Sequence, residues 1–300
     1  MTQLTTIDTN NYAAMAKAMG IANEKTSARE KSSTLARMRI NHKPIMGLGD
    51  VNGKKVNMEV VPGGLYRLDM PDGISYYAPT VKIRSFLTRF MYKRFVKGMG
   101  DKPNMFVKSI MADDLNIDLK DNVGGFNCGK PAGYIEDFKS LPADTQKLIK
   151  EIKRVRVILG TVEMVNPVDA QGNSVVLDVT PFIWEIDNRD AFKTVGANFT
   201  QFAKLQLLPV QHTIIANTEE RKANNGDSFY LPITSLDVSN QIDLTEKDQE
   251  MFGDFMLWLD NYNSYIANEW AKKANSHLPD EDSDVVDDII DIDIDEEDAA

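Results

Sequence analysis

The chain has 300 residues, a hydrophobic content of 42% and a formal net charge of −11, so it can bury the core of one large domain or two smaller ones. No stretch approaches the roughly 20 apolar residues of a membrane span, and residues 1–12 lack the apolar centre of a signal peptide, which predicts a cytoplasmic protein, without a membrane partner. The single cysteine, Cys128, excludes an intrachain disulfide, as is typical of a reducing compartment.

The charge is divided unevenly along the chain. Residues 1–160 contain 26 basic and 16 acidic residues, residues 161–279 contain 8 and 17, and residues 280–300 contain 12 acids and no base. A basic half within an acidic chain indicates that one surface binds nucleic acid or another polyanion.

Residues 1–40 predict a flexible, partly helical basic arm. A helix can form over about 11–19, but Gly20 interrupts it. Within residues 31–39, cations stand beside small hydroxyl residues, a composition that can follow a phosphate backbone.

Residues 41–279 predict an elaborated domain rich in strands. Three short β-rich runs, 56–61, 65–70 and 74–78, are separated by the turn sequences Pro62-Gly63-Gly64 and Pro71-Asp72-Gly73. Such runs between turn residues predict a β-meander.

Residues 82–97 follow the meander and contain six basic residues, four aromatic residues and no acid. Cations neutralise phosphates and rings stack on unpaired bases, so the stretch suits single-stranded nucleic acid; alternatively, the rings are core residues and the cations a solvated face. Val81 and Ile83 alternate with cations as in a strand, whereas Phe86 and Phe90 have helical spacing. A strand that gives way to a helix near Ser85 satisfies both patterns.

Residues 98–133 predict a long, partly irregular insertion rich in glycine. Its segment 124–131 nearly matches a phosphate-binding P-loop, but Pro131 stands where a magnesium-binding Ser or Thr is needed and no hydrophobic strand precedes it. This excludes a nucleotide hydrolase. The segment is either a structural turn or a mobile loop that offers Phe126, Lys130 and Tyr134 to a ligand.

The second half of the domain predicts two hairpins with a helix between them. After a short helix over 141–151, residues 152–165 alternate cations with β-branched residues, and a turn at 169–173 joins them to a second strand over 174–186. Capping residues at 187–190 begin a helix that reaches about Leu207, and a further hairpin pairs residues 211–218 with 228–233. Together with the earlier strands, this pattern predicts a mostly β chain with helices (α+β), an elaborated oligonucleotide-binding (OB) barrel.

A long helix is expected from Thr245 to about Ala274. Its apolar residues lie near helical spacing and predict packing against the barrel rather than a cofactor surface: Met251, Phe255, Trp258, Leu259, Tyr262 and Ile266. Residues 280–300 predict a disordered acidic tail that can compete with DNA for a basic groove.

Catalytic patterns are few. The chain has no Gly-x-Ser-x-Gly elbow and no His-Glu-x-x-His motif, and Cys128 with the three histidines lacks the close pairs of a zinc site, so no metal and no cofactor are expected. A Mg²⁺-dependent nuclease stays open as an alternative if several acids converge, namely Glu163, Asp178, Glu185, Asp187 and Asp190.

A basic, aromatic, β-rich body followed by a long helix and an acidic tail resembles the single-stranded-DNA-binding replication proteins of bacteriophages, whose core is an OB fold. The segment Lys31-Ser32-Ser33-Thr34 is similar to the motif by which some of them bind cooperatively. The chain departs from the family by lacking the zinc ligands of one branch and the C-terminal aromatic residue of another. The resemblance implies coating of single-stranded DNA in a host cytoplasm, self-association on DNA, and replication proteins as partners of the tail.

The sequence therefore predicts a non-enzymatic protein that coats and protects single-stranded DNA in replication or recombination, without sequence preference. The alternatives are the nuclease and a virion or assembly protein. Cations are expected to bind phosphates and rings to stack on bases, the candidates being Tyr77, Lys82, Arg84, Phe86, Arg89, Phe90, Tyr92, Lys93, Arg94, Phe95, Lys97, Lys130, Lys153, Arg154 and Arg156.

Overall fold

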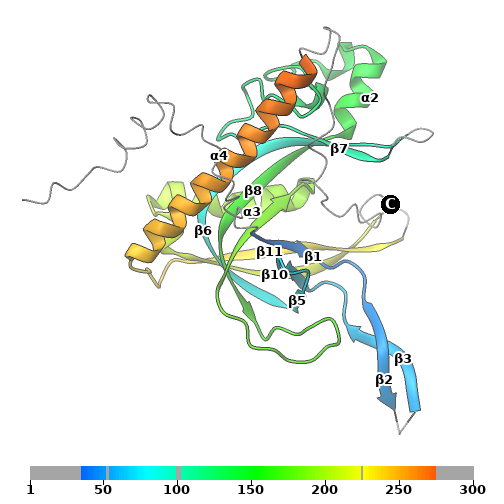
Figure 1. Ribbon diagram of the computed structural model, residues 1–300, viewed down its shortest axis with the longest axis vertical. Helices are drawn as coiled ribbons and strands as arrows, with labels where there is room; N and C mark the ends of the chain where they lie inside the picture. Colours follow the sequence, from blue (N-terminus) through cyan, green and yellow to red (C-terminus); the bar gives the residue numbers. More distant parts are fainter. Residues whose placement is uncertain (1–34, 52–53, 99–102, 224–225, 275–300) are drawn as a thin grey trace, which may run out of the picture. The chain divides into compact units, whose positions relative to one another are not determined.

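The structure, a computed structural model, is a mixed α+β fold made mostly of strands (Figure 1). It describes residues 35–51, 54–98, 103–223 and 226–274. The expected acidic tail and residues 1–34 of the expected arm lie outside the described residues. The α+β class expected from the sequence is confirmed.

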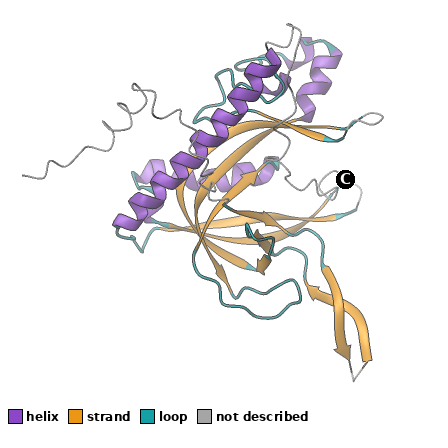
Figure 2. Ribbon diagram, viewed as in Figure 1, coloured by secondary structure: helices purple, strands orange, loops and turns teal. Residues whose placement is uncertain are grey.

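A nine-stranded sheet is the main element, with the strand order β11-β10-β6-β8-β9-β1-β4-β5, and β7 pairs with the second half of β6. Figure 2 shows these strands in orange, together with a separate two-stranded ribbon formed by β2 and β3. The bounds are β1 Ala36–Ile40, β2 Ile45–Val51, β3 Lys54–Val61, β4 Tyr66–Asp69, β5 Ser75–Ala78, β6 Thr80–Val96, β7 Met105–Lys108, β8 Ile152–Val165, β9 Thr180–Ile186, β10 Thr213–Lys222 and β11 Ser228–Asp237.

Two expected boundaries and one expected strand pairing need correction. Residues 36–40, which were expected in the flexible arm, form strand β1 of the sheet. Ala36 and Met38 are buried while Arg37 and Arg39 point to the opposite side, which is the alternation of a strand. In the meander, β3 pairs with β2 and not with β4. The strand expected over 174–186 begins only at Thr180, since the ladder of β9 with β8 spans 180–186.

Three α-helices lie in the described part of the chain: α2 Ala143–Glu151, α3 Arg189–Leu205 and α4 Glu246–Ala274. The predicted cap of α3 is confirmed, because the Asn188 side chain accepts hydrogen bonds from the backbone N–H groups of Asp190 and Ala191. Packing of the α4 stripe is also confirmed, with Phe255, Leu259 and Ile266 buried.

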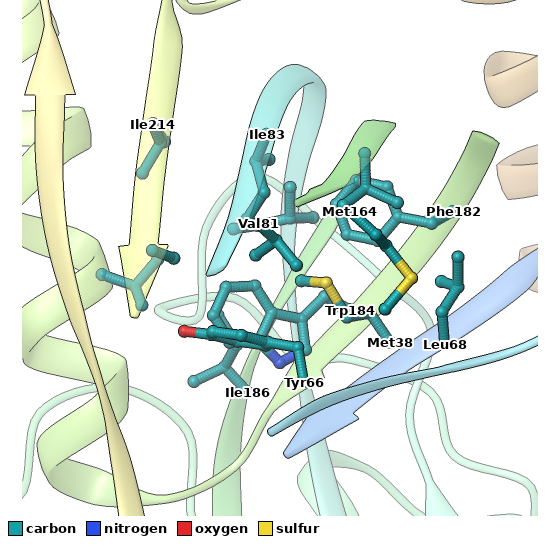
Figure 3. Close-up of a cluster of buried hydrophobic side chains, with 14 of the residues drawn as sticks. Met38, Tyr66, Leu68, Val81, Ile83, Met164, Phe182, Trp184, Ile186 and Ile214 are labelled. Carbon is teal, nitrogen blue, oxygen red and sulfur yellow. The ribbon is translucent and has the colours of Figure 1, made fainter. Parts of the chain in front are cut away.

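The two faces of the sheet carry separate cores. On the α3 face, Val195 and Phe202 of α3 pack with strand residues; Figure 3 shows part of this core, including Met38, Tyr66, Leu68, Val81, Ile83, Phe182 and Trp184. On the α4 face, Phe255 and Leu259 pack against Leu87, Met91, Val155, Val157 and Leu159. The central strands β6, β8 and β9 are therefore covered by α3 on one face and α4 on the other, and β8 is buried on both sides over 155–162.

A third, smaller core lies under the glycine-rich insertion and joins Cys128 to Tyr92, Val107 and Leu119. The Cys128 thiol shares its one proton between the backbone oxygens of Tyr92, 3.3 Å away, and Val107, 3.4 Å away. These bonds fix the insertion against the second half of β6.

The described strands do not form a closed barrel, so the expected OB barrel is not confirmed; β11 and β5 are the two ends of the sheet order. Side chains nevertheless connect β4 to β10. The Tyr66 hydroxyl donates to the backbone oxygen of Asn217 at 3.1 Å, and the Thr218 hydroxyl donates to the backbone oxygen of Gly64. The sheet is thus curved enough to bring elements near its two ends into contact.

Strand β6 is continuous through Ser85, so the expected change to a helix there is wrong. The strand contains a β-bulge instead: Ser85 pairs with Gly160 and Leu87 with Leu159, which leaves Phe86 as an extra residue and puts Phe86 and Phe90 on opposite faces of the sheet. Gly160 is required here because a Cβ atom would lie 2.0 Å from the backbone oxygen of Arg84.

None of the helices described in the structure combines the length and the apolar character needed to cross a membrane.

Candidate nucleic-acid interface

The bulge at Phe86 divides the basic, aromatic residues 82–97 between the two faces of the sheet. Before the bulge, Arg84 and Phe86 lie on the α4 face of the sheet. After it, Phe90 and Tyr92 lie on the α3 face. Met91 and Lys93, which alternate with them, lie on the α4 face. The stretch therefore does not form one continuous surface.

The residues before the bulge make contacts within the protein. Lys82 pairs with Glu163 at 2.8 Å, and Arg84 pairs with Asp248 at 3.1 Å. The Phe86 ring packs edge-on against Phe255 of α4, with the centroids 5.4 Å apart. Tyr77 belongs to the core and is 3% exposed, so its ring cannot stack on a base as expected.

On the α3 face, rings surround Arg156. Its guanidinium carbon lies 4.8 Å from the ring centroids of Phe90 and Phe192 and 5.3 Å from that of Phe199. Burial lowers the pKa of this guanidinium, and at Gly196 a Cβ atom would lie 2.7 Å from it. Arg156 and Phe90 thus stabilise the packing of α3 instead of offering a free cation and a free ring.

On the α4 face, two lysines share one carboxylate. Glu185 lies 3.5 Å from the ammonium of Lys93 and 3.4 Å from that of Lys108. Burial alone would raise the pKa of Glu185, but Lys108, Lys93 and Arg37 outweigh it and lower that pKa to about 2. Burial and the neighbouring cations lower the pKa of Lys108.

The other candidates on β6 and β8 differ in exposure. Phe95 packs on Phe106, with the centroids 5.2 Å apart, and Lys153 pairs with Asp187 at 3.0 Å. Arg89 donates to the backbone oxygen of Thr88 and is half-buried, as is Arg94, whereas Lys97 is exposed.

The remaining candidates, Lys130 and Arg154, converge on a pocket of about 310 Å³. We call it the Lys130 pocket; its walls come from β6, β8, α2 and the insertion, and include Tyr92, Leu115, Lys130, Tyr134, Ile149, Ile152 and Arg154. Tyr92 is its floor, since its ring is 2% exposed and its hydroxyl donates to the backbone oxygen of Leu115 at 3.1 Å. Tyr92 is therefore a core residue and not the stacking ring expected from the sequence.

The loop itself positions Lys130. The Lys130 ammonium donates to the backbone oxygens of Pro131 and Gly133, both 2.9 Å away, and lies 5.6 Å from the Tyr92 ring centroid. Burial and the charge of Arg154 lower the pKa of Lys130, against a smaller opposite effect of the Asp118 carboxylate. Among the described residues, no carboxylate forms an ion pair with Lys130 or Arg154. The pocket thus holds two cations that repel each other and that an anion would stabilise.

An exposed ring completes the pocket. Tyr134 is 86% exposed, and the walls formed by Leu115, Ile149 and Ile152 are apolar. Two cations beside a free ring and apolar walls can bind a phosphate together with a flat base.

The glycine-rich insertion already indicated Tyr134 in the sequence. Phe192, whose ring packs on Arg156, was not singled out from the sequence. Phe192 and Phe199 are seven residues apart on α3 and so lie on one side of the helix, which is the signal that could have found this ring.

Three of the five acids considered for a magnesium site pair with cations, and Asp178 is exposed. Glu163, Glu185 and Asp187 each pair with lysine, and Asp190 stands in the first turn of α3. Within the part of the chain that the structure describes, no three His, Cys, Asp or Glu side chains gather so that they could hold a metal ion.

The Lys130 pocket is thus the place where candidate residues remain accessible together. Its parts come from distant segments, because Tyr92, Lys130 and Arg154 are adjacent only through the pairing of β6 with β8 and the folding of the insertion over both. No family model matches the chain, and neither a curated protein nor a solved structure matches it, so the arguments about function rest on this geometry.

Proposed function

We propose that this chain is a non-enzymatic protein that binds single-stranded DNA without sequence preference and coats it during replication or recombination. The observation that carries the proposal is the Lys130 pocket, where Lys130 and Arg154 converge with no carboxylate in ion-pair contact among the described residues, beside the exposed ring of Tyr134. The cations would bind a phosphate and the ring would stack on a base.

The strand order supports an OB-like arrangement as a further part of the proposal. If β6, β8, β9, β10 and β11 are numbered one to five, their order in the sheet is five-four-one-two-three, and α3 joins the third to the fourth, as in an OB fold. Strands β1 and β4 would fill the gap between the third and fifth strands.

The position of the pocket agrees with this numbering. OB folds bind oligonucleotides beside their second and third strands and at the loops between strands one and two and between strands four and five. Arg154 lies on the second strand, and Lys130 and Tyr134 lie in the connection between the first and second. The pairing of Glu163, Glu185 and Asp187 with lysines gives the nuclease alternative no comparable support.

Titration of a labelled single-stranded oligonucleotide, followed by fluorescence anisotropy across a salt series, tests the proposal. Lys130→Gln and Arg154→Gln should each reduce the slope of log affinity against log salt by about 0.7, because each removes one phosphate contact. Tyr134→Ala should weaken binding by about 1–3 kcal/mol through lost stacking.

Lys204→Gln is the matched control, because it removes the same charge from an exposed position at the end of α3. Pocket variants that bind as the control does would exclude the pocket as the site. A native protein that fails to bind the oligonucleotide would overturn the function itself. Mg²⁺-dependent cleavage would favour the nuclease, and large particles without any DNA binding would favour an assembly protein.

A further inference from the structure

A cluster of charged side chains on the α4 face of the sheet holds more positive than negative charge. Lys93 and Lys108 are partners in the ladder of β6 with β7, and both contact the Glu185 carboxylate of β9. The charge of Arg37, on β1, acts on Glu185 and on Lys108, so this guanidinium lies close to both. Among the described residues, no other carboxylate forms an ion pair with these three cations. We call the four residues the Glu185 cluster.

The excess of positive charge is costly because the cluster is partly buried. The side chains of Lys93, Lys108 and Glu185 are 18%, 13% and 20% exposed. Partly buried cations without a matching number of carboxylates repel each other and are not fully compensated for the water that they have lost. An anion from solution would remove this imbalance, which is a reason to expect a ligand here.

Two rings of α4 lie beside the cluster. The Trp258 and Tyr262 rings stack with their centroids 5.8 Å apart and their planes inclined by 11°. The Tyr262 hydroxyl donates to the backbone oxygen of Ser109, 3.0 Å away, which fixes this ring. The charges of Glu185 and Arg37 act on the same hydroxyl, so the ring borders the Glu185 cluster. Trp258 is partly exposed, and a nucleic-acid base can therefore extend the stack beyond it.

The other flank of α4 faces the insertion and is separate from this surface. Trp258 and Tyr262 lie one turn apart on one side of the buried stripe of α4, whereas Phe252 and Trp270 lie on the other side. Asp254 is exposed one turn before Trp258 and bounds the surface there. Phe252 is thus a comparable ring that lies away from the Glu185 cluster.

We propose that the Glu185 cluster and Trp258 form a second subsite for single-stranded DNA, on the face of the sheet opposite to the Lys130 pocket. Lys93 and Lys108 would bind a phosphate group, and Trp258 would stack on a neighbouring base. This subsite rests on the proposed function and extends it, because the same strand would be held at two places.

The two subsites lie at the same end of β6 and β8. Lys153 is opposite Lys93 in the ladder of these strands, whereas the next residue, Arg154, points to the other face and lines the Lys130 pocket. The side chains of Lys153 and its partner Asp187 are 55% and 32% exposed, so their pair contributes little to stability and can open for a phosphate. A flexible strand can thus contact cations on both faces.

Fluorescence anisotropy of the full chain with a labelled single-stranded oligonucleotide, across a salt series, tests the second subsite. Lys108→Gln should reduce the slope of log affinity against log salt by about 0.7, and Trp258→Leu should weaken binding about 5- to 150-fold through lost stacking. Lys204→Gln and Phe252→Leu are the matched controls, since they remove an equal charge and an aromatic ring from exposed positions away from the cluster. Both controls should bind as the native chain does.

Lys108→Gln also separates a loss of binding from a loss of folding. In this variant Glu185 keeps its pair with Lys93 and one repelling cation is gone, so the midpoint of chemical denaturation should stay at the native value or rise. Combined with Lys130→Gln, it should reduce the slope by about 1.4, because two separate phosphate contacts are lost.

Glu185→Gln gives the sharper result. It removes the carboxylate of the cluster, so it should tighten binding at low salt and steepen the slope by up to about 0.7, even though it lowers stability. The affinity is measured where denaturation curves show that the variant is folded. Unchanged or weaker binding by this variant would overturn the second subsite, because the cations would then hold an anion that competes with DNA, such as the acidic residues 280–300, or none at all.

Two further outcomes separate this subsite from the pocket. If Lys108→Gln and Trp258→Leu bind as their controls do while Lys130→Gln binds more weakly, the second subsite is wrong and the pocket remains. A native chain that does not bind the oligonucleotide would overturn both.

Discussion

Tyr92→Ala is expected to lower the free energy of unfolding by about 3–5 kcal/mol, as large aromatic truncations in cores do. The Tyr92 ring is 2% exposed and packs with Val107, Leu119 and Cys128 beneath the insertion. Removing it leaves a cavity and an unpaired backbone oxygen at Leu115. Chemical denaturation followed by circular dichroism measures the loss.

Tyr92→Phe is the matched control, because it keeps the ring and removes only the hydroxyl that donates to Leu115, at a cost of about 1 kcal/mol. If Tyr92→Ala left stability unchanged and only weakened DNA binding, the ring would be a stacking surface. The assignment of Tyr92 to the core would then be wrong.

Glu185→Gln is expected to destabilise the protein by about 3 kcal/mol at neutral pH, the lower end of the range for breaking a buried ion pair. The change leaves Lys93 and Lys108 without the carboxylate that they share, beside a third cation, Arg37. Denaturation midpoints of both proteins across a pH series measure the effect.

The pH dependence has a definite sign. Because the pKa of Glu185 is lowered from 4.5 to about 2 on folding, its ionised form stabilises the folded state fully above pH 4.5. That stabilisation is lost as the pH falls towards 2, so the difference between native protein and variant should shrink over this range. Glu163→Gln is the control, because its pair with Lys82 is about half-exposed and contributes less than about 1 kcal/mol. An equal effect of both substitutions would contradict the buried pairing of Glu185.

The elements of this fold could be predicted where local patterns are strong. The strand expected over 152–165 and the Asn188 cap of α3 were both confirmed, although residues 155–162 of that strand are buried on both faces. The spacing of Phe86 and Phe90 was misleading, because four residues are about one helical turn, whereas here a bulge puts the two rings on opposite faces of the sheet. Only the facing residue, Gly160, distinguishes the bulge from a helical turn, and it lies more than 70 residues away in the sequence.

The candidate site was predictable only in part, for a similar reason. A basic side chain looks alike in the sequence whether it is free or paired, and the partners that neutralise Lys82 and Arg84 are Glu163 and Asp248, far along the chain. Lys130 and Arg154 could be chosen as candidates individually. Their convergence follows from tertiary folding, which no local pattern encodes.

Because Cys128 is buried in the third core, the rate at which a probe modifies its thiol measures how often that core opens. Cys128 is 1% exposed, its thiol is held by two backbone oxygens, and burial raises its pKa, so the thiolate that reacts with alkylating probes is scarce while the third core is closed. Because it is the chain's single cysteine, modification by such a probe follows the opening of this one core, two residues from Lys130. The rate of thiol labelling thus gives the free energy of opening beneath the pocket without any engineered label.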